Sequence, residues 1–432
     1  MFERLAICSP LALASRIGRE VLLDGGNAVD AAIATNVVLA VAYPHMCGVG
    51  GDLLAMVWAD GELAGLNSSG ALPRNAPPLE GPVPFRGIGS ATVPGAVAGW
   101  SALAERFGTR PLHELARPAI ELARDGVVKP PSLLRMLEQH RQVPFLDAEA
   151  SGIFAGQGRL IQPQLATTLD ELDSFYDGRV AERAPDPFTP DDFRAHRAEW
   201  VEPMRRGFAG IEVCEMPPNS RGHLVLEALG RLESLDGLTP TDAAWHARLL
   251  RAITAVDVAS DTIYLCCVDA SGMAVSLNQS LFAGFGSGVM VPGTGVLLHN
   301  RGAFHTVESY VGGAKPVHTL SPAMCLQEGR PQLVFGTMGG TAQIQIHLQL
   351  LARILIAGEN VQAAIDAPRW VYKSGRMGVE PGLPDLSDAL PGTEIVPIDS
   401  PEDAGHAHAI EIEATRLAAA VDPRSDGVPL GE

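Results

Sequence analysis

Two short segments of the sequence could together perform acyl chemistry. Thr262 begins an apolar run, Thr262-Ile-Tyr-Leu-Cys-Cys-Val268, that predicts a β-strand, and Gly339-Gly340 follows a second strand-like run. If the Asp261–Thr262 bond is cleaved, the new α-amine, with a pKa of about 7.7–8.0, can act as base for its own hydroxyl. Successive backbone N–H groups of a glycine pair can hold an oxyanion. Strand propensity of threonine and turn preference of glycine are the alternative explanation.

Other chemistries lack a signature in this sequence. It contains no G-x-S-x-G, no P-loop and no H-E-x-x-H motif. Gly284-Phe-Gly-Ser-Gly288 has neither the spacing of a dinucleotide loop nor a following acidic residue, and it predicts a turn. His406 and His408 could share one face of a strand, but no third ligand follows at a suitable spacing. We expect an enzyme without metal or cofactor.

The candidate residues need a sheet to position them. Residues 262–268 and 273–277 read as two strands of a hairpin, joined by Asp269-Ala-Ser-Gly272. Asn27 is a predicted N-cap for a helix that ends near Tyr43-Pro44. A glycine loop and a strand over 53–58 follow that helix. Residues 342–358 alternate like a strand in part, but their length favours a helix.

Helices are also expected elsewhere in the first half of the chain. The patterns predict helices over 95–107 and 111–125, and a further helical region to about Arg251 that is interrupted by Pro217-Pro-Asn-Ser-Arg-Gly222. Residues 69–94 are rich in Gly and Pro and predict a long irregular segment.

Composition and charge narrow the class of partner. The 432 residues carry 32 Lys and Arg against 50 Asp and Glu, a net charge of −18, which disfavours nucleic acids and anionic membranes. Hydrophobic residues make up 46% of the chain, enough for a large core. The apolar stretch Val37–Tyr43 is far short of the roughly 20 residues of a membrane helix. We therefore expect a small-molecule partner.

Cysteine usage and the N-terminus indicate a compartment. The six cysteines are scattered without metal or disulfide spacing and are expected to be reduced, with Cys266 and Cys267 on opposite faces of one strand. The short apolar run at the N-terminus is broken by Ser9-Pro10, which fits a signal peptide poorly. The expected location is the cytoplasm.

A series of ordered motifs covers nearly the whole chain. In chain order they are Asp24-Gly-Gly-Asn-Ala-Val-Asp-Ala-Ala32, Gly48-Val-Gly-Gly51, Thr92-Val-Pro-Gly95, Pro118-Ala-Ile-Glu-Leu-Ala123 with Asp125-Gly126, Met216-Pro-Pro218, Gly293-Thr-Gly295, Asn300, Met338-Gly-Gly340, Asp366-Ala-Pro-Arg369 and Asp422-Pro-Arg424. In this order they resemble the motifs of γ-glutamyltransferases. Four further motifs, Asp261-Thr-Ile-Tyr264, Asn278-Gln-Ser280, Gly284-Phe-Gly-Ser-Gly288 and Asn300-Arg-Gly302, resemble the bacterial γ-glutamyltransferase-like branch.

The resemblance implies an N-terminal-nucleophile hydrolase with an α+β, four-layer αββα sandwich. Such a precursor cuts itself before a threonine, here Thr262, which would give segments 1–261 and 262–432 entwined in one domain. Ser280 matches the second hydroxyl that supports the nucleophile. Gly339 and Gly340 match the glycine pair of the oxyanion hole.

The residues that match the family's substrate site depart from its pattern. Ser69 stands in place of the arginine that pairs with the substrate α-carboxylate, and Phe282 in place of an asparagine. Ala303 stands in place of the acidic residue that receives the α-amine, and His318-Thr319 in place of a serine pair. With this α-amino-acid clamp largely absent, selection for a glutamyl group should weaken.

Arg301 replaces a family glutamine beside Asn300. We hypothesise that it supplies a positive charge for an acidic acyl group; the alternative is a structural salt bridge.

The sequence thus predicts an amidohydrolase or acyltransferase acting on a γ-glutamyl-type or related amide. Alternatives are an acylase or a carbon–carbon hydrolase for a secondary metabolite, and an uncleaved binding protein. The short stretch Ala252–Asp261 before the cleavage point bears on the last of these, because a short tether could prevent self-cleavage. The two segments are expected to stay associated, and a homo-oligomer is compatible with the sequence.

Overall fold

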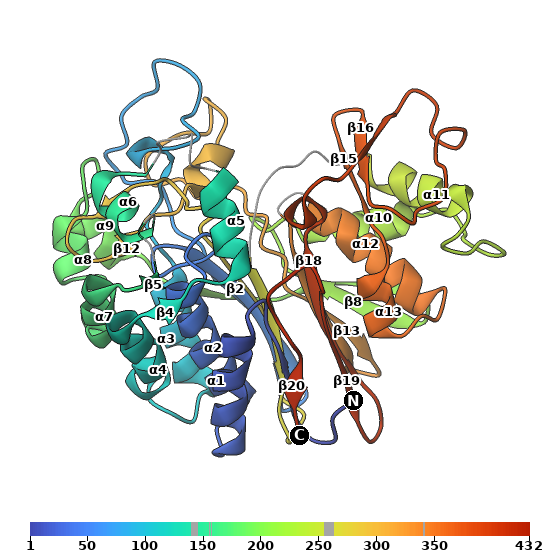
Figure 1. Ribbon diagram of the computed structural model, residues 1–432, viewed down its shortest axis with the longest axis horizontal. Coiled ribbons are helices and arrows are strands. Elements are labelled where there is room, and N and C mark those ends of the chain that lie inside the picture. The colour runs from blue at the N-terminus through green and yellow to red at the C-terminus, as the bar shows by residue number, and fades with distance from the viewer. Residues whose placement is uncertain (140–145, 155, 157, 255–262, 340–341) are drawn as a thin grey trace.

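Two stacked β-sheets form the centre of the protein, and helices cover the outer face of each sheet (Figure 1). The computed structural model describes residues 1–139, 146–154, 156, 158–254, 263–339 and 342–432. Thr262 and Gly340 lie outside the described residues. The four layers confirm the expected α+β, αββα sandwich.

The first sheet interleaves strands from both sides of the predicted cleavage point. Its order is β20-β1-β9-β10-β2-β3-β6, and every neighbouring pair is antiparallel. The hairpin β9–β10 is the one predicted from the sequence, closed by a turn in which Gly272 N donates to Asp269 O at 3.0 Å. The strands are β1 (Ala6–Cys8), β2 (Asp52–Ala59), β3 (Glu62–Ser68), β6 (Glu199–Val201), β9 (Ile263–Val268), β10 (Ala274–Ser280) and β20 (Leu430–Gly431).

The second sheet has the order β19-β18-β14-β13-β8-β7 and is also antiparallel throughout. Its face toward the first sheet forms an apolar layer between the two sheets. The strands are β7 (Met204–Phe208), β8 (Ile211–Glu215), β13 (Ala323–Gln327), β14 (Arg330–Met338), β18 (His406–Ile412) and β19 (Leu417–Val421).

Helices of the two outer layers complete two further apolar cores. The first sheet packs against a layer that includes α1 (Ala12–Leu23), α2 (Ala28–Ala42), α3 (Ala96–Phe107), α4 (Leu112–Asp125) and α7 (Pro163–Asp170). The second packs against α10 (His223–Arg231), α11 (Ala243–Ile253), α12 (Ala342–Leu355) and α13 (Val361–Asp366). The helices over 96–107 and 112–125 confirm the sequence prediction.

None of the described helices is long and apolar enough to cross a membrane. Further short elements lie around the four layers. They are the helices α5 (Pro131–Gln139), α6 (Ala148–Phe154), α8 (Arg179–Arg183) and α9 (Pro190–Ala195), the 3₁₀ turns η1 (Ile88–Ser90), η2 (Leu172–Ser174), η3 (Arg301–Phe304) and η4 (Pro401–Ala404), and the strands β4 (Val127–Val128), β5 (Arg159–Leu160), β11 (Met290–Val291), β12 (Val296–Leu297), β15 (Trp370–Lys373), β16 (Arg376–Val379) and β17 (Glu394–Pro397).

Strand β9 shows how the sequence specifies the layers. Its side chains alternate, because successive residues of a strand point to opposite faces. Cys266 lies in the core between the sheets and Cys267 in the core under the helices, as predicted. The six cysteines are free and buried.

Local signals account for α2 and α12. Asn27 and Asp30 form a reciprocal capping box, with Asp30 N donating to Asn27 Oδ1 at 2.9 Å and Asn27 N to Asp30 Oδ2 at 3.0 Å. In α12 the alternating glutamines are not a strand pattern. Gln345 and Gln349 are buried and bond the backbone of β15, which explains polar residues on a buried helix face.

The helical region predicted up to about Arg251, with an interruption at residues 217–222, is wrong in part, because strands β6, β7 and β8 precede that interruption. Strands β7 and β8 form a hairpin whose connection, Ala209-Gly210, has positive φ at both residues (50° and 82°). Two central residues of positive φ are the mark of a type I′ turn, which matches the twist of a hairpin. Exposed arginines on the edge strand β7 hide the apolar alternation that would have revealed it.

Candidate active site

One asparagine joins the two segments that carry the predicted chemistry. Asn278 on β10 is buried, and its Nδ2 donates to Ile263 O at 2.9 Å and to Thr337 O at 3.1 Å. Its Oδ1 accepts from Ser321 N at 3.2 Å. Ile263 follows Thr262 directly in sequence, and Thr337 precedes Met338-Gly339. The start of β9 and the end of β14 are therefore held within the reach of a single side chain.

Ser280 is the last residue of β10 and lies two positions after Asn278, so both side chains share the face toward the second sheet. The residue is buried, and its Oγ accepts from Phe282 N at 2.7 Å. This contact helps to hold Phe282, which has a positive φ of 78°.

Gly339 occupies a backbone conformation that requires glycine. It has a φ of +136°, and a Cβ there would lie 3.2 Å from Gly405 Cα. Gly405 is equally constrained: its φ is +69°, and a Cβ would meet Met338 O at 2.4 Å. The end of β14 and the turn before β18 thus touch backbone to backbone.

Arg301 lies fully buried in η3, behind the end of β10. Its guanidinium carbon lies 4.6 Å from the centre of the Phe282 ring and 5.5 Å from that of Phe304. Nη1 donates to Thr319 Oγ1 at 2.9 Å. Within the part of the chain that the structure describes, Nε and Nη2 have no hydrogen-bond partner.

The preceding residue fixes this turn in place. Asn300 Oδ1 accepts from Ala283 N at 3.0 Å, and its Nδ2 donates to Phe85 O at 2.8 Å. Asn300 therefore ties the loop after β10 to a segment far away in sequence. The turn that carries Arg301 is thus held by hydrogen bonds to two other segments.

A buried acid lies near Arg301. Asp52, at the start of β2, has Oδ2 3.0 Å from His318 Nε2 and Oδ1 3.8 Å from His299 Nε2. Burial raises the pKa of Asp52 to about 7, and the positive charge of Arg301 opposes this rise. Burial lowers the pKa of Arg301 to about 9, with Asp52 opposing.

Both histidines of this cluster are neutral at pH 7. Burial, followed by the charge of Arg301, lowers the pKa of His299 to about 3 and the pKa of His318 well below its usual value. Leu320 N lies 3.4 Å from His318 Nδ1 and Arg301 N lies 3.2 Å from His299 Nδ1. These partners assign the proton to Nε2 in each ring. Arg301 is therefore the charged group of the cluster at pH 7, joined by Asp52 as the pH rises through about 7.

The structure brings the predicted substrate residues together but gives them different surroundings. Arg301, Thr319 and Phe282 are in direct contact. Ser69 Oγ donates to Asn67 Oδ1 at 2.8 Å, so it already serves a contact within the protein. Both ring nitrogens of His318 are likewise engaged, which favours a role in holding Asp52 rather than a contact with substrate.

Asp52 and the bridging role of Asn278 were not predicted from the sequence. Asp52 follows Gly48-Val-Gly-Gly51 directly, and Asn278 opens the Asn278-Gln-Ser280 motif. A polar residue at the edge of a glycine motif was the available signal in the first case. The contacts of Asn278 depend on three strands and carry no local signal.

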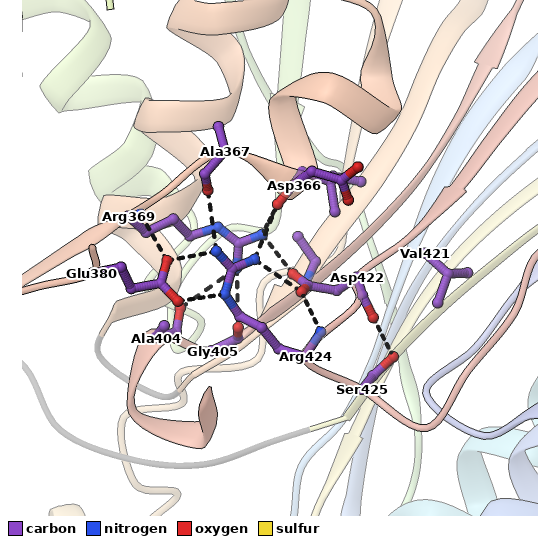
Figure 2. Close-up of polar contacts among 12 residues, drawn as sticks. Asp366, Ala367, Arg369, Glu380, Ala404, Gly405, Val421, Asp422, Arg424 and Ser425 are labelled. Carbon is purple, nitrogen blue, oxygen red and sulfur yellow. Dashed lines mark hydrogen bonds and ion pairs between the residues drawn. The ribbon is translucent and has the colours of Figure 1, made fainter. Parts of the chain in front are cut away.

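A second polar cluster supports the Gly339 side of the site (Figure 2). Arg369 and Asp422, both buried, form an ion pair with Nη2 2.5 Å from Oδ2. Arg369 Nη1 donates to Gly405 O at 3.0 Å, and Ala407 N donates to Asp422 Oδ2 at 2.8 Å. The cluster therefore holds the turn that contacts Gly339 in place through hydrogen bonds.

Charge complementarity in this cluster is high. Burial would raise the pKa of Asp422, but Arg369 and Arg424 hold it well below its usual range. Arg424 Nε also donates to Glu380 Oε1 at 2.7 Å. His406 and His408 lie nearby on β18, and among the residues described no group of three potential ligands could hold a metal ion.

A four-layer αββα sandwich, with a strand that begins directly after the predicted nucleophile, is the architecture of N-terminal-nucleophile hydrolases. The sequence profile of gamma-glutamyltranspeptidase matches residues 14–255 and 241–431. The protein belongs to this family and is an N-terminal-nucleophile amidohydrolase.

Relatives within the family differ in activity. The glutathione hydrolase-like YwrD proenzyme of Bacillus subtilis is 33% identical, covering 98% of each chain. The oxamate amidohydrolase proenzyme of Klebsiella pneumoniae is 31% identical over 98% of this chain and 97% of its own. The crystal structure of cephalosporin acylase from Bacillus halodurans superposes with a TM-score of 0.91 at 28% identity, covering 100% of this chain and 96% of that one.

Proposed function

We propose that Thr262, freed by self-cleavage of the Asp261–Thr262 bond, is the nucleophile of an amide hydrolase. Its α-amine takes the hydroxyl proton as Oγ attacks the amide carbon, and the N–H groups of Gly339 and Gly340 hold the oxyanion. The α-amine then protonates the leaving amine, and water hydrolyses the resulting ester. The observation that carries this proposal is the Asn278 bridge between Ile263 and Thr337.

Ser280 supports the nucleophile in this proposal. It lies on the same face of β10 as Asn278, and the contact from Phe282 N orients its Oγ. A fixed hydroxyl costs no reorganisation when charge develops during the reaction, which is the condition for effective electrostatic support.

The acyl group is proposed to be something other than an α-amino acid. Ser69 is occupied by Asn67, and Ala303 offers no charge for an ammonium group. The relatives named for oxamate and cephalosporin also point away from a glutamyl group. Hydrolysis of γ-glutamyl amides is the second candidate, supported by the resemblance to the glutathione hydrolase-like protein.

Self-cleavage is tested by the intact mass of purified wild-type protein beside Thr262→Ala. We expect the wild type to separate into segments 1–261 and 262–432 under denaturing conditions and the variant to remain one chain. Thr262→Ser, which keeps a hydroxyl, is the matched control and should still cleave. A wild-type chain that stays whole after prolonged incubation would contradict the proposal and favour the uncleaved binding protein.

The reaction itself is tested with acyl 4-nitroanilides. Release of nitroaniline by the cleaved wild type and none by Thr262→Ala is the expected result. A higher kcat/KM for γ-glutamyl anilide than for simple acyl anilides would favour the second candidate.

A further inference from the structure

Among the residues that the structure describes, one edge of the Arg301 guanidinium has no hydrogen-bond partner. The group is planar, and Nε and Nη2 present two parallel N–H donors along one edge. Nη1, on the other side, is occupied by Thr319 Oγ1 at 2.9 Å. The open edge is therefore the one whose geometry matches the two oxygens of a carboxylate.

The surroundings exclude water from this group without neutralising it locally. Arg301 has no exposed surface, and the rings of Phe282 and Phe304 lie against the guanidinium. Leaving buried N–H donors unpaired costs free energy, more so when the group is charged. A protein can retain such an unfavourable arrangement at a functional site, where a bound ligand supplies the missing hydrogen-bond partners.

Asp52 is not the carboxylate that pairs with the Nε–Nη2 edge of Arg301. Its charge attracts Arg301, but its oxygens face His318 and Gly70 N instead. Taking the described residues together, no carboxylate oxygen lies within 4.0 Å of a nitrogen of Arg301. The alternative of a structural salt bridge, open from the sequence, finds no carboxylate partner for Arg301 in the described part of the chain.

We propose that the Nε–Nη2 edge of Arg301 binds a carboxylate in the acyl part of the substrate, so that the enzyme hydrolyses monoamides of short dicarboxylic acids. This inference rests on the proposed function for its reaction but not for its binding site. The acyl part stays covalently attached through both half-reactions, while the amine leaves and water enters. A binding group that is fully buried suits the part that stays.

The experiment compares carboxylate-bearing and neutral substrates on variants of Arg301. Substrates are the 4-nitroanilides of oxalate, malonate, succinate and glutarate, each with one free carboxylate, beside the acetyl and butyryl anilides. Arg301→Met keeps the length and the contacts with the two rings, and Arg301→Lys keeps the charge without the two-donor edge. The matched control is Arg194→Met on α9, where an exposed arginine pairs with Asp191.

We expect Arg301→Met to lower kcat/KM for the carboxylate-bearing anilides by about 30- to 3,000-fold, the range for truncating one partner of a buried charge pair. Neutral anilides should change less than about threefold, since they make no use of the edge. Arg301→Lys should fall between, because it offers charge without bidentate geometry. Arg194→Met should match the wild type.

Several outcomes would overturn the inference. Equal losses on acidic and neutral anilides would show that Arg301 is structural. A preference for anilides that carry the carboxylate on the amine side, such as a 5-amino-2-nitrobenzoate amide of a neutral acyl group, would overturn its assignment to the acyl part. A cleaved, active wild type that does not prefer acidic acyl groups would overturn the inference and leave the proposed function standing.

Binding is measured separately, by calorimetry with oxalate, malonate, succinate and glutarate on the uncleaved Thr262→Ala protein. Binding that is lost in Thr262→Ala/Arg301→Met supports the carboxylate site even if self-cleavage fails and the proposed function falls. Absence of binding by all four dicarboxylates, together with absence of the substrate preference, would overturn it.

Discussion

Two arginines of this protein are equally buried but differ in what their guanidinium groups touch. Arg369 donates from Nη1 to Gly405 O and from Nη2 to Ile365 O and to the Asp422 carboxylate. Within the described ranges, Arg301 donates only from Nη1 to Thr319, and its guanidinium packs against two aromatic rings. Among the described residues, the first group is bonded at both terminal nitrogens and lacks a partner at Nε, whereas the second is bonded at Nη1 and lacks a partner at Nε and Nη2.

The difference separates a supporting arginine from a receptive one. A guanidinium with both terminal nitrogens bonded, beside an ionised carboxylate, fixes the backbone around it, here the Gly405 turn that touches Gly339. A buried guanidinium with unpaired N–H donors can use these donors to bind a ligand. Burial alone does not distinguish the two roles, whereas counting the bonded donors does.

Removing each arginine should have opposite consequences for stability, and this is the largest expected effect. Arg369→Met leaves Asp422 charged and buried without its main partner, which should cost about 3–5 kcal/mol of unfolding free energy. Arg301→Met removes a poorly compensated charge and should be neutral or stabilising. Both are measured by urea unfolding in the single-chain Thr262→Ala background. Similar losses in the two variants would remove the distinction.

A ligand should stabilise the Arg301 region and leave the Arg369 region unaffected. Glutarate or succinate at 100 times its Kd should add about 2.7 kcal/mol to the unfolding free energy through mass action. The effect should vanish in Arg301→Met. Thermal unfolding at increasing dicarboxylate concentration measures this, with the monocarboxylate butyrate as the control for ionic strength.

Gly405→Ala tests whether the Arg369 region acts on the chemistry. A Cβ at this position would lie 2.4 Å from Met338 O and force a strained φ, so the end of β14 must shift. We expect kcat to fall by about tenfold or more, as when an oxyanion donor is displaced, with KM changed little. Gly392→Ala, at a glycine of similar φ (+83°) with open space around it, controls for backbone strain alone. Equal effects of the two changes would place Gly405 outside the site.

The smallest expected effect is a dependence of substrate preference on pH. Above about pH 7 Asp52 becomes ionised, so its charge competes with a substrate carboxylate for Arg301. The ratio of kcat/KM for acidic over neutral anilides should therefore fall as the pH rises through 7, by about tenfold or less. His299 and His318 stay neutral throughout, and the ratio cancels the titration of the Thr262 amine. Lys315 and His196 also act on this cluster, but in Asp52→Asn the ratio should stay flat through pH 7 and fall only as the pH approaches the pKa of Arg301, about 9.

Local sequence signals predicted much of the frame that holds the site. The β9–β10 hairpin follows from the Asp269–Gly272 turn, and α2 from the Asn27 cap, because each depends on neighbouring residues alone. The β7–β8 hairpin was missed, since an edge strand with exposed arginines has little apolar alternation. Thr262 and Gly340, which lie outside the described residues, remain predictions.

The surroundings of Arg301 could not be derived from the sequence. Its contacts come from Phe282 and Phe304 and from Thr319, which reach it through turns with no periodic pattern. The sequence showed that Arg301 places a positive charge where the family has a glutamine. It left open whether a carboxylate of the protein would pair with this arginine. Only the packed structure shows that Asp52 faces elsewhere.

The interleaved first sheet has a consequence for the life of the enzyme. Strand β1 of the first segment lies between β9 and β20 of the second, and β10 pairs with β2 across the same boundary. As one chain, the precursor assembles this order in a unimolecular reaction. After the cut, the same assembly becomes a second-order encounter of two incomplete sheets. Maturation thus makes unfolding effectively irreversible. A mature molecule that unfolds in dilute solution does not readily refold, and its lifetime is set by its unfolding rate.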